Sequence, residues 1–195
     1  MQLLVFNFFW MTFNVILALI AVMLGQIGLK TKNKLFKSLV FIAWLVFLPN
    51  TIYLFTDLIN LIHQWGKLNF YQTIVLIFQY LVLQIFGFVT FILALYPFEK
   101  SLRLLKINKQ KIDLYLIALN LLVAFGITLG RVERINSWDV LEHPLKVLFA
   151  SIHILSSFDL LGLTILFAAF SNISYFLLRK PVLKCISIYL SQADV

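Results

Sequence analysis

Charge and cysteine are both scarce in this sequence. Charged residues make up 12% of the 195 positions, and only eight residues are acidic, whereas 62% are hydrophobic. A soluble domain is about half apolar and a quarter charged, so this composition excludes an ordinary soluble protein. The single Cys185 excludes an intramolecular disulfide and any metal site built from several cysteines. Because no soluble block of domain length is present, we expect residues 1–195 to form one transmembrane domain.

The few charges are mostly positive, with sixteen Lys and Arg and a formal net charge of +8. These cations lie in short segments beside apolar runs, and no groove pattern of basic and aromatic residues accompanies them. That grouping is typical of membrane topology, and we expect no nucleic-acid partner.

Apolar runs of membrane-spanning length are abundant and predict an all-α, polytopic helix bundle with about five transmembrane helices plus interfacial helices. The expected spans are Leu3–Leu29, a second that starts near Leu35 and meets Pro49, Phe70–Tyr96 ending at Pro97, Ile112–Gly130, and a fifth that ends near Leu178. The second run has only fourteen residues before Pro49, or about 21 Å of helix. It therefore has to extend past Pro49 unless the bilayer is thin there.

The segment Leu145–Leu178 is too long for one upright span. We expect an interfacial helix followed by a span, joined near Ser156–Asp159. Two short spans are the alternative, but they would place the basic C-terminal tail outside the cell, against the positive-inside rule.

The distribution of cations predicts the orientation. Twelve of the sixteen lie in three segments, Lys30–Lys37, Lys100–Lys111 and Arg179–Lys184. With five spans, these segments face the cytoplasm, the N-terminus faces out and the C-terminus faces in.

Both polar stretches that interrupt the apolar sequence then lie on the extracytoplasmic side. The first is LPNTIYLFTDLINLIHQW, Leu48–Trp65. Pro49 favours a non-helical Leu48, and Asn50 is a typical N-cap for a new helix. At helical spacing, Tyr53, Thr56 and Asp57 share one face. They point either to water, from a helix lying on the outer leaflet, or into a cavity between spans.

The second polar stretch is GRVERINSWDVLEHP, Gly130–Pro144. Gly130 is expected to be the C-cap of the fourth span, with Arg131 and Arg134 on one face if a helical turn continues. Guanidinium groups bind carboxylates and phosphates. The arginines therefore either pair internally with an acid such as Asp57 or bind an anion or a lipid headgroup. The remaining candidates for this site are Asn50 from the first stretch and Asn136, Trp138 and Asp139 from the second.

These two stretches resemble the two characteristic blocks of a bacterial family of polytopic membrane proteins of unknown function, LPN-x-x-Y-x-x-TDL-x-x-L and GR-x-x-R-x-NSWD. The resemblance covers roughly Leu35–Pro144 and departs at Asn60, where many relatives have a histidine. It implies a multi-pass protein of the bacterial plasma membrane and no established activity.

Three classes of function fit these residues. The favoured one is a binding protein whose outward polar site takes a lipid headgroup, an anionic solute or a membrane-protein partner. The alternatives are an enzyme acting on a lipid or lipid-linked substrate at the outer leaflet, and a small substrate-binding subunit of a transporter. We expect no cofactor, and no metal site, because no spacing typical of metal ligands is present.

Overall fold

The computed structural model describes residues 2–193, with the side chains of residues 2–186. This part of the chain contains nine helices and no strand. The helices are α1 (Gln2–Lys30), α2 (Lys34–Phe47), α3 (Pro49–Thr56), α4 (Leu58–Trp65), α5 (Phe70–Leu104), α6 (Lys109–Arg131), α7 (Asp139–Glu142), α8 (Pro144–Ser156) and α9 (Phe158–Ala193).

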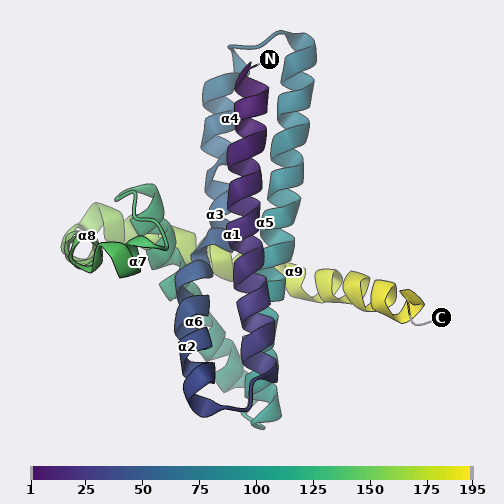
Figure 1. Ribbon diagram of the computed structural model, residues 1–195, viewed down its shortest axis with the longest axis vertical. Coiled ribbons are helices and arrows are strands. Elements are labelled where there is room, and N and C mark those ends of the chain that lie inside the picture. The colour runs from purple at the N-terminus through teal and green to yellow at the C-terminus, as the bar shows by residue number, and fades with distance from the viewer. Residues whose placement is uncertain (1, 194–195) are drawn as a thin grey trace.

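Two long helices, α1 and α5, lie side by side along the long axis of the molecule (Figure 1). Helices α2, α3 and α4 follow one another along this pair, whereas α6 accompanies only its lower half (Figure 1). Helices α7 and α8 lie to one side, and α9 crosses the long axis beside α6. The protein is therefore not a simple bundle of parallel and antiparallel helices.

Five segments are long and apolar enough to cross a membrane: Gln2–Lys30, Lys34–Trp65, Phe70–Leu104, Lys109–Arg131 and Phe158–Ile186. The predicted all-α fold with five such helices is confirmed for the described residues. The second segment does continue past Pro49, because α3 and α4 extend the direction of α2. The expected break near Ser156–Asp159 is also present, since α8 ends at Ser156 and α9 begins at Phe158.

Two expected span ends are wrong: the third helix does not end at Pro97, and the fifth does not end near Leu178, because α9 continues through Pro181. Pro97 lies inside α5, which continues to Leu104. A proline in a membrane helix removes one backbone hydrogen bond, and neighbouring groups can satisfy the carbonyls around it. Here the Trp44 indole N–H donates to the Ala94 carbonyl at 3.1 Å, and the Ser101 hydroxyl donates to the Pro97 carbonyl at 2.8 Å. Packing against α2 thus favours a helix that passes through the proline.

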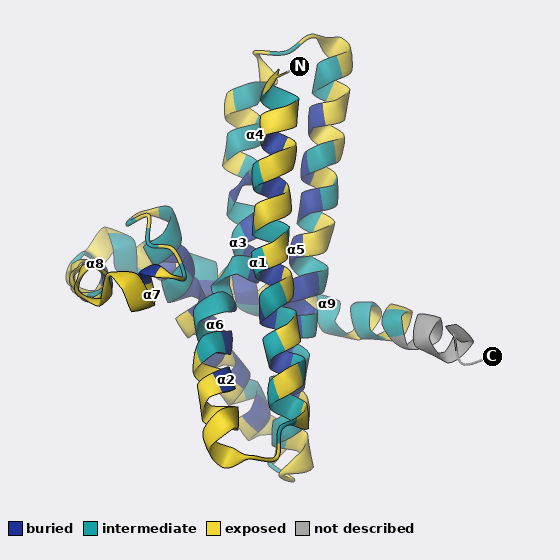
Figure 2. Ribbon diagram, viewed as in Figure 1, coloured by how far each residue is buried: buried dark blue, intermediate teal, exposed yellow. Residues whose placement is uncertain are grey.

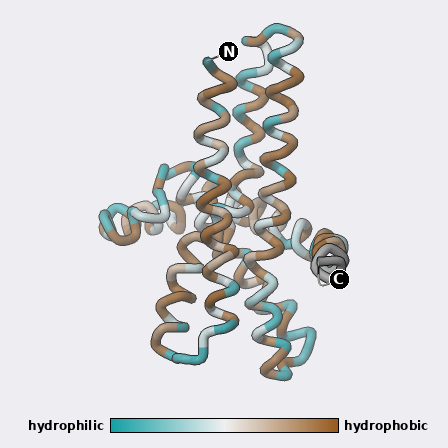
Figure 3. Tube along the Cα trace, turned by 45° about the vertical axis from the view of Figure 1, so that its right-hand side comes forward, coloured by the Kyte–Doolittle hydropathy of each residue, from teal (hydrophilic) through white to brown (hydrophobic). Residues whose placement is uncertain are grey.

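Buried residues follow the middle of the molecule, where α1, α2, α3, α5, α6 and α9 meet (Figure 2). Apolar residues nevertheless cover most of the outer helix surfaces, and hydrophilic residues gather at the connections between helices (Figure 3). In water such an apolar surface would favour aggregation, whereas in a membrane these side chains contact lipid.

Gly126 in α6 allows α3 to approach closely. A Cβ atom at this position would lie 2.4 Å from Pro49 Cγ and 2.9 Å from Pro49 Cβ. Real Cβ atoms do not tolerate such distances, so any side chain here separates the two helices that carry the polar stretches.

We expect Gly126→Ala to lower the free energy of unfolding by about 1–3 kcal/mol, the usual range for overpacking. Gly162 in α9 is the matched control, because a Cβ atom added there would have no other atom within 4 Å. There the same substitution should raise stability by about 0.5–1 kcal/mol through helix propensity alone. Unfolding by SDS titration in mixed micelles measures both, and equal effects at the two sites would contradict the close approach.

Candidate functional site

The first half of the first polar stretch, α3, belongs to the core, whereas its second half, α4, contains no buried residue. Leu48 is fully buried and has helical dihedral angles, and its N–H donates to the Trp44 carbonyl at 2.8 Å. Pro49 takes the first position of α3, where a missing N–H does no harm. Two expectations are therefore wrong: Leu48 is not extended, because its packing in the core outweighs the local preference before proline, and Asn50 is not the N-cap. The Asn50 amide instead donates to the Phe47 carbonyl and to Ser137 Oγ, at 3.0 and 2.8 Å.

The end of α6 also differs from the expectation. Gly130 is not a C-cap, since α6 continues through Arg131 and no described glycine has a positive φ. Its role is again spatial: a Cβ at Gly130 would lie 3.3 Å from the Tyr53 ring. The chain reverses later, at Arg134, which has a φ of 53°.

Asp57 and Arg131 meet at the junction of α3, α4 and α6. Arg131 Nη1 lies 3.2 Å from Asp57 Oδ1, and its guanidinium lies 5.9 Å from the centre of the Tyr53 ring. Asp57 is only 3% exposed, and the Asn14 and Asn60 amides donate to it at 3.5 and 3.4 Å. Asp57 requires this partner, because a buried carboxylate without its cation would be strongly destabilising, whereas the Arg131 side chain is 24% exposed. Of the two alternatives for the arginines, pairing with an internal acid is thus observed for Arg131.

Arg134 does not join this pair. It follows the end of α6 in a left-handed conformation, so the two arginines do not share a helix face. Its side chain is exposed and makes no ion pair with any described residue. The acid between them, Glu133, pairs with His153 at 2.7 Å.

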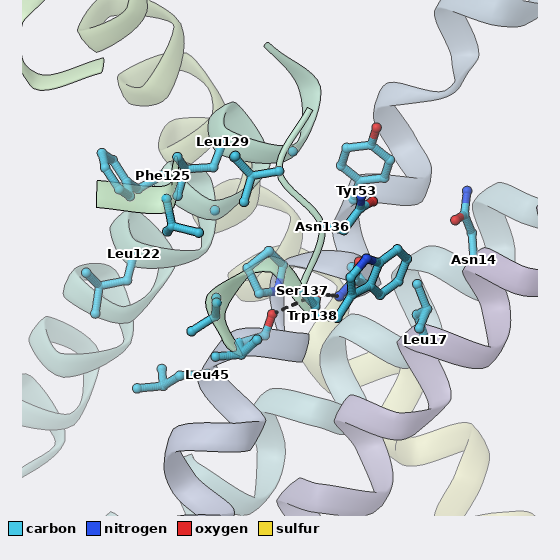
Figure 4. A pocket seen from close by; sticks show the side chains of 18 of the residues that line it. Asn14, Leu17, Leu45, Tyr53, Leu122, Phe125, Leu129, Asn136, Ser137 and Trp138 are labelled. Atoms are coloured by element: carbon cyan, nitrogen blue, oxygen red, sulfur yellow. Dashed lines mark hydrogen bonds between the residues drawn. The ribbon is translucent and has the colours of Figure 1, made fainter. Parts of the chain in front are cut away.

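A cavity of about 330 Å³ lies beside the Asp57–Arg131 pair. It is lined by residues of α1, α2, α3, α6 and α8 and of the segment that connects α6 to α8. Five of the nine expected site residues line it, namely Asn50, Tyr53, Asp57, Asn136 and Trp138. The apolar side chains Leu122, Phe125 and Leu129 lie on one side of the cavity, and Tyr53 and Trp138 lie on the other (Figure 4).

The other expected residues lie outside the cavity lining. Arg131 does not line it but contacts two residues that do, Asp57 and Tyr53. The Thr56 hydroxyl donates to the Tyr53 carbonyl of its own helix at 2.7 Å. Asp139 is buried and accepts a 2.6 Å hydrogen bond from the backbone N–H of Asn136, while Lys146 lies 3.8 Å away. Asp139 therefore holds the loop that carries Asn136 and Trp138.

Two polar lining residues, Asn14 and Ser137, were not expected at this site. Asn14 comes from the middle of the first apolar run, and Ser137 donates to the Val46 carbonyl at 3.2 Å while accepting from Asn50. A signal for Asn14 does exist in the sequence. Asn7 and Asn14 are seven residues apart and so share one face of α1, where Asn7 donates to Gln64 at 2.7 Å.

The cavity offers hydrogen bonds and shape more than reactive groups. Its one acid, Asp57, is already compensated by Arg131, and no histidine or cysteine lines it. Nearby, Asp139, Glu142 and His143 have potential ligand atoms within 4.8 Å of one another. Asp139, however, already bonds to the Asn136 N–H and faces Lys146. The expectation of no metal stays a prediction.

A second buried polar cluster, which was not predicted from the sequence, lies near the C-terminal end of α5. Glu99 is 3% exposed. It accepts from the Tyr175 hydroxyl at 2.6 Å, from Arg179 at 3.3 Å and from Arg103 Nε at 3.1 Å. Arg179 also lies 3.7 Å from Asp113. This cluster joins α5, α6 and α9.

The fold and the site together define a polytopic helical protein of membrane type with a polar cavity among its helices. Residues 13–174 match the sequence family described as "Protein of unknown function (DUF1361)". The match covers most of the chain, so the protein belongs to this family, and the expected membership in a family of unknown function is confirmed. No curated protein and no solved structure matches the chain.

Proposed function

We propose that this protein binds the polar headgroup of a lipid or lipid-linked amphiphile in the cavity beside Asp57 and Arg131. The observation that carries the proposal is the composition of the cavity wall. Amide and hydroxyl groups from Asn14, Asn50 and Tyr53 meet apolar side chains in one hollow of about 330 Å³. A small number of placed polar groups in an otherwise apolar pocket is typical of a ligand site.

Lipid fits this wall better than a free anion does. Phe13 and Leu122 line the cavity, lie on candidate spans and are 49% and 59% exposed. In a membrane such side chains contact hydrocarbon, so an amphiphile has a lateral path with its chains still in lipid. The Asp57–Arg131 pair is neutral as a unit, which disfavours a site selected by charge alone.

A photo-crosslinking amino acid at Phe125 tests the proposal, because Phe125 lines the cavity. Benzophenone-phenylalanine at this position should capture one lipid class that is enriched over the bulk membrane. The same amino acid at Phe6, which is 69% exposed on α1, should capture lipids in bulk proportions. Asn50→Ala should reduce the enrichment roughly fivefold, since it removes one hydrogen-bonding group.

Mass spectrometry of the adducts decides between the outcomes. Identical adducts at Phe125 and Phe6 would overturn lipid binding in the cavity. A captured water-soluble anion or a captured protein would favour the other two binding hypotheses. A melting curve of each variant shows whether Asn50→Ala acts through binding or through unfolding.

We further propose which membrane holds the protein and how the protein is oriented in it. The resemblance to a bacterial family favours the bacterial plasma membrane, and the three cation-rich segments favour an outward N-terminus and a cytoplasmic C-terminus. The cavity then faces the extracytoplasmic side.

A topology reporter fused after Lys106 should read as cytoplasmic, and one near Glu142 as external. The opposite readings would reverse the orientation.

A further inference from the structure

We propose that the lysine-bearing start of α2 and the apolar crevice beside it form a second site, which binds an anionic phospholipid. The site lies at the end of the bundle that carries the α1–α2 connection (Figure 1). It shares no lining residue with the polar cavity, so it does not depend on the function proposed there.

The crevice has a volume of about 240 Å³ and lies between α1, α2 and α5. Its lining is almost entirely apolar and contains no acid. Phe41, Trp44 and Phe98 stack on one another with ring centres 5.4–6.3 Å apart. The hydrogen bond from Trp44 to the Ala94 carbonyl holds this aromatic wall in place. These surfaces suit an acyl chain.

A shallow hollow with a different chemistry adjoins the crevice. It is lined by Lys34, Lys37, Ser38, Phe41 and Ile42, and it shares Lys37 and Phe41 with the crevice. Both lysines are exposed, and neither forms an ion pair with any described residue. The nearby acid Glu99 is already engaged by Arg103 and Arg179. A negative charge in this hollow would therefore be supplied from outside the chain.

The hollow also lies at the N-terminus of α2. Lys34 is the first residue of this 14-residue helix, and the Asn33 side chain caps only the Phe36 N–H. The remaining N–H groups of a first turn have no acceptor within the helix, and the helix dipole favours an anion there. The dipole and the two lysines thus act in the same direction on a phosphate.

A phospholipid satisfies both parts of the site at once. Its phosphate would lie between Lys34 and Lys37, and one acyl chain would occupy the crevice beyond Phe41. Free phosphate would leave the apolar crevice unused. A lipid with a net neutral headgroup gains less, because its cationic group would lie near the lysines.

Native mass spectrometry of the delipidated, full-length protein tests this site. Dioleoyl phosphatidylglycerol should bind roughly 10- to 30-fold more tightly than dioleoyl phosphatidylcholine, given the usual contribution of two lysines near an anionic surface. In Lys34→Gln/Lys37→Gln this preference should fall to about twofold or less. Gly28→Leu, which fills the crevice and leaves both lysines in place, should weaken binding of both lipids.

Lys67→Gln is the matched control, because Lys67 is also exposed and lies in the connection between α4 and α5, which is at the opposite end of the molecule from the α1–α2 connection (Figure 1). Its lipid preference should equal that of the wild type. The proposal is overturned if the wild type does not prefer phosphatidylglycerol, if Lys67→Gln loses as much as the double variant, or if glycerol phosphate competes as well as the whole lipid. If the double variant does not fold, Lys37→Gln alone should lose part of the preference, and an unchanged preference would overturn the site.

Discussion

Arg131→Ala is expected to lower the free energy of unfolding by about 3 kcal/mol or more, because it leaves Asp57 buried without its cation. Asp57 is 3% exposed, and its other partners are two amides at 3.4–3.5 Å. The same change at Arg134 should have an effect within about 0.5 kcal/mol, since that side chain is exposed and unpaired. The two arginines lie three residues apart in the same sequence block, so this comparison isolates the tertiary contact.

A second substitution separates a lost ion pair from general damage to α6. Asp57→Asn removes the charge that Arg131→Ala leaves uncompensated. The double variant Asp57→Asn/Arg131→Ala should therefore be more stable than Arg131→Ala alone, as a double-mutant cycle would show. Simple addition of the two single losses, measured by SDS titration in mixed micelles, would mean that the pair contributes no coupling energy.

Glu99→Ala should be similarly severe, lowering stability by about 3–5 kcal/mol. The substitution leaves Arg179 without one of its two acids and the buried Tyr175 hydroxyl without an acceptor. Glu142→Ala is the control, because Glu142 is exposed and its carboxylate forms no ion pair with a described residue. It should change stability by less than about 0.5 kcal/mol.

Tyr175→Phe measures how much of the stability loss expected for Glu99→Ala comes from the hydrogen bond between Tyr175 and Glu99. It removes one 2.6 Å hydrogen bond to a charged group and leaves the ring packing intact. A loss of about 1.5–3 kcal/mol is expected, smaller than that of Glu99→Ala. If Glu99→Ala unfolds at the same detergent concentration as Glu142→Ala, the cluster does not attach α9 to α5 in the way that its geometry indicates.

Local patterns accounted for the helices and for part of the cavity. The lengths of the apolar runs predicted five spanning helices. The segment Leu145–Leu178 is too long for one span, and this length predicted the separation of α8 from α9 near Ser156–Asp159. Helical spacing placed Tyr53 and Asp57 on one side of their segment, and both line the cavity. These features depend on neighbours within a few residues, which is why a single sequence reveals them.

Local preference failed where packing opposed it. Pro49 and Pro97 were expected to interrupt helices, yet Leu48 stays helical and α5 continues to Leu104. Gly130 was expected to end α6, but it instead makes room for the Tyr53 ring. In each case contacts with another helix outweigh a propensity of about 1–3 kcal/mol.

Hydrophobicity along the chain determined, by itself, that this is an all-helical protein of membrane type, because every apolar run of sufficient length has to satisfy its own backbone in lipid. Only the tertiary structure decided which scattered polar groups became partners. Asp57 and Arg131 are 74 positions apart in the sequence, and Glu99 and Tyr175 are 76 apart. Local sequence patterns contain no information about contacts at such separations. Of the two arginines in one short block, Arg131 at the end of α6 lies partly buried beside an acid, and Arg134, beyond the end of the helix, lies in solvent.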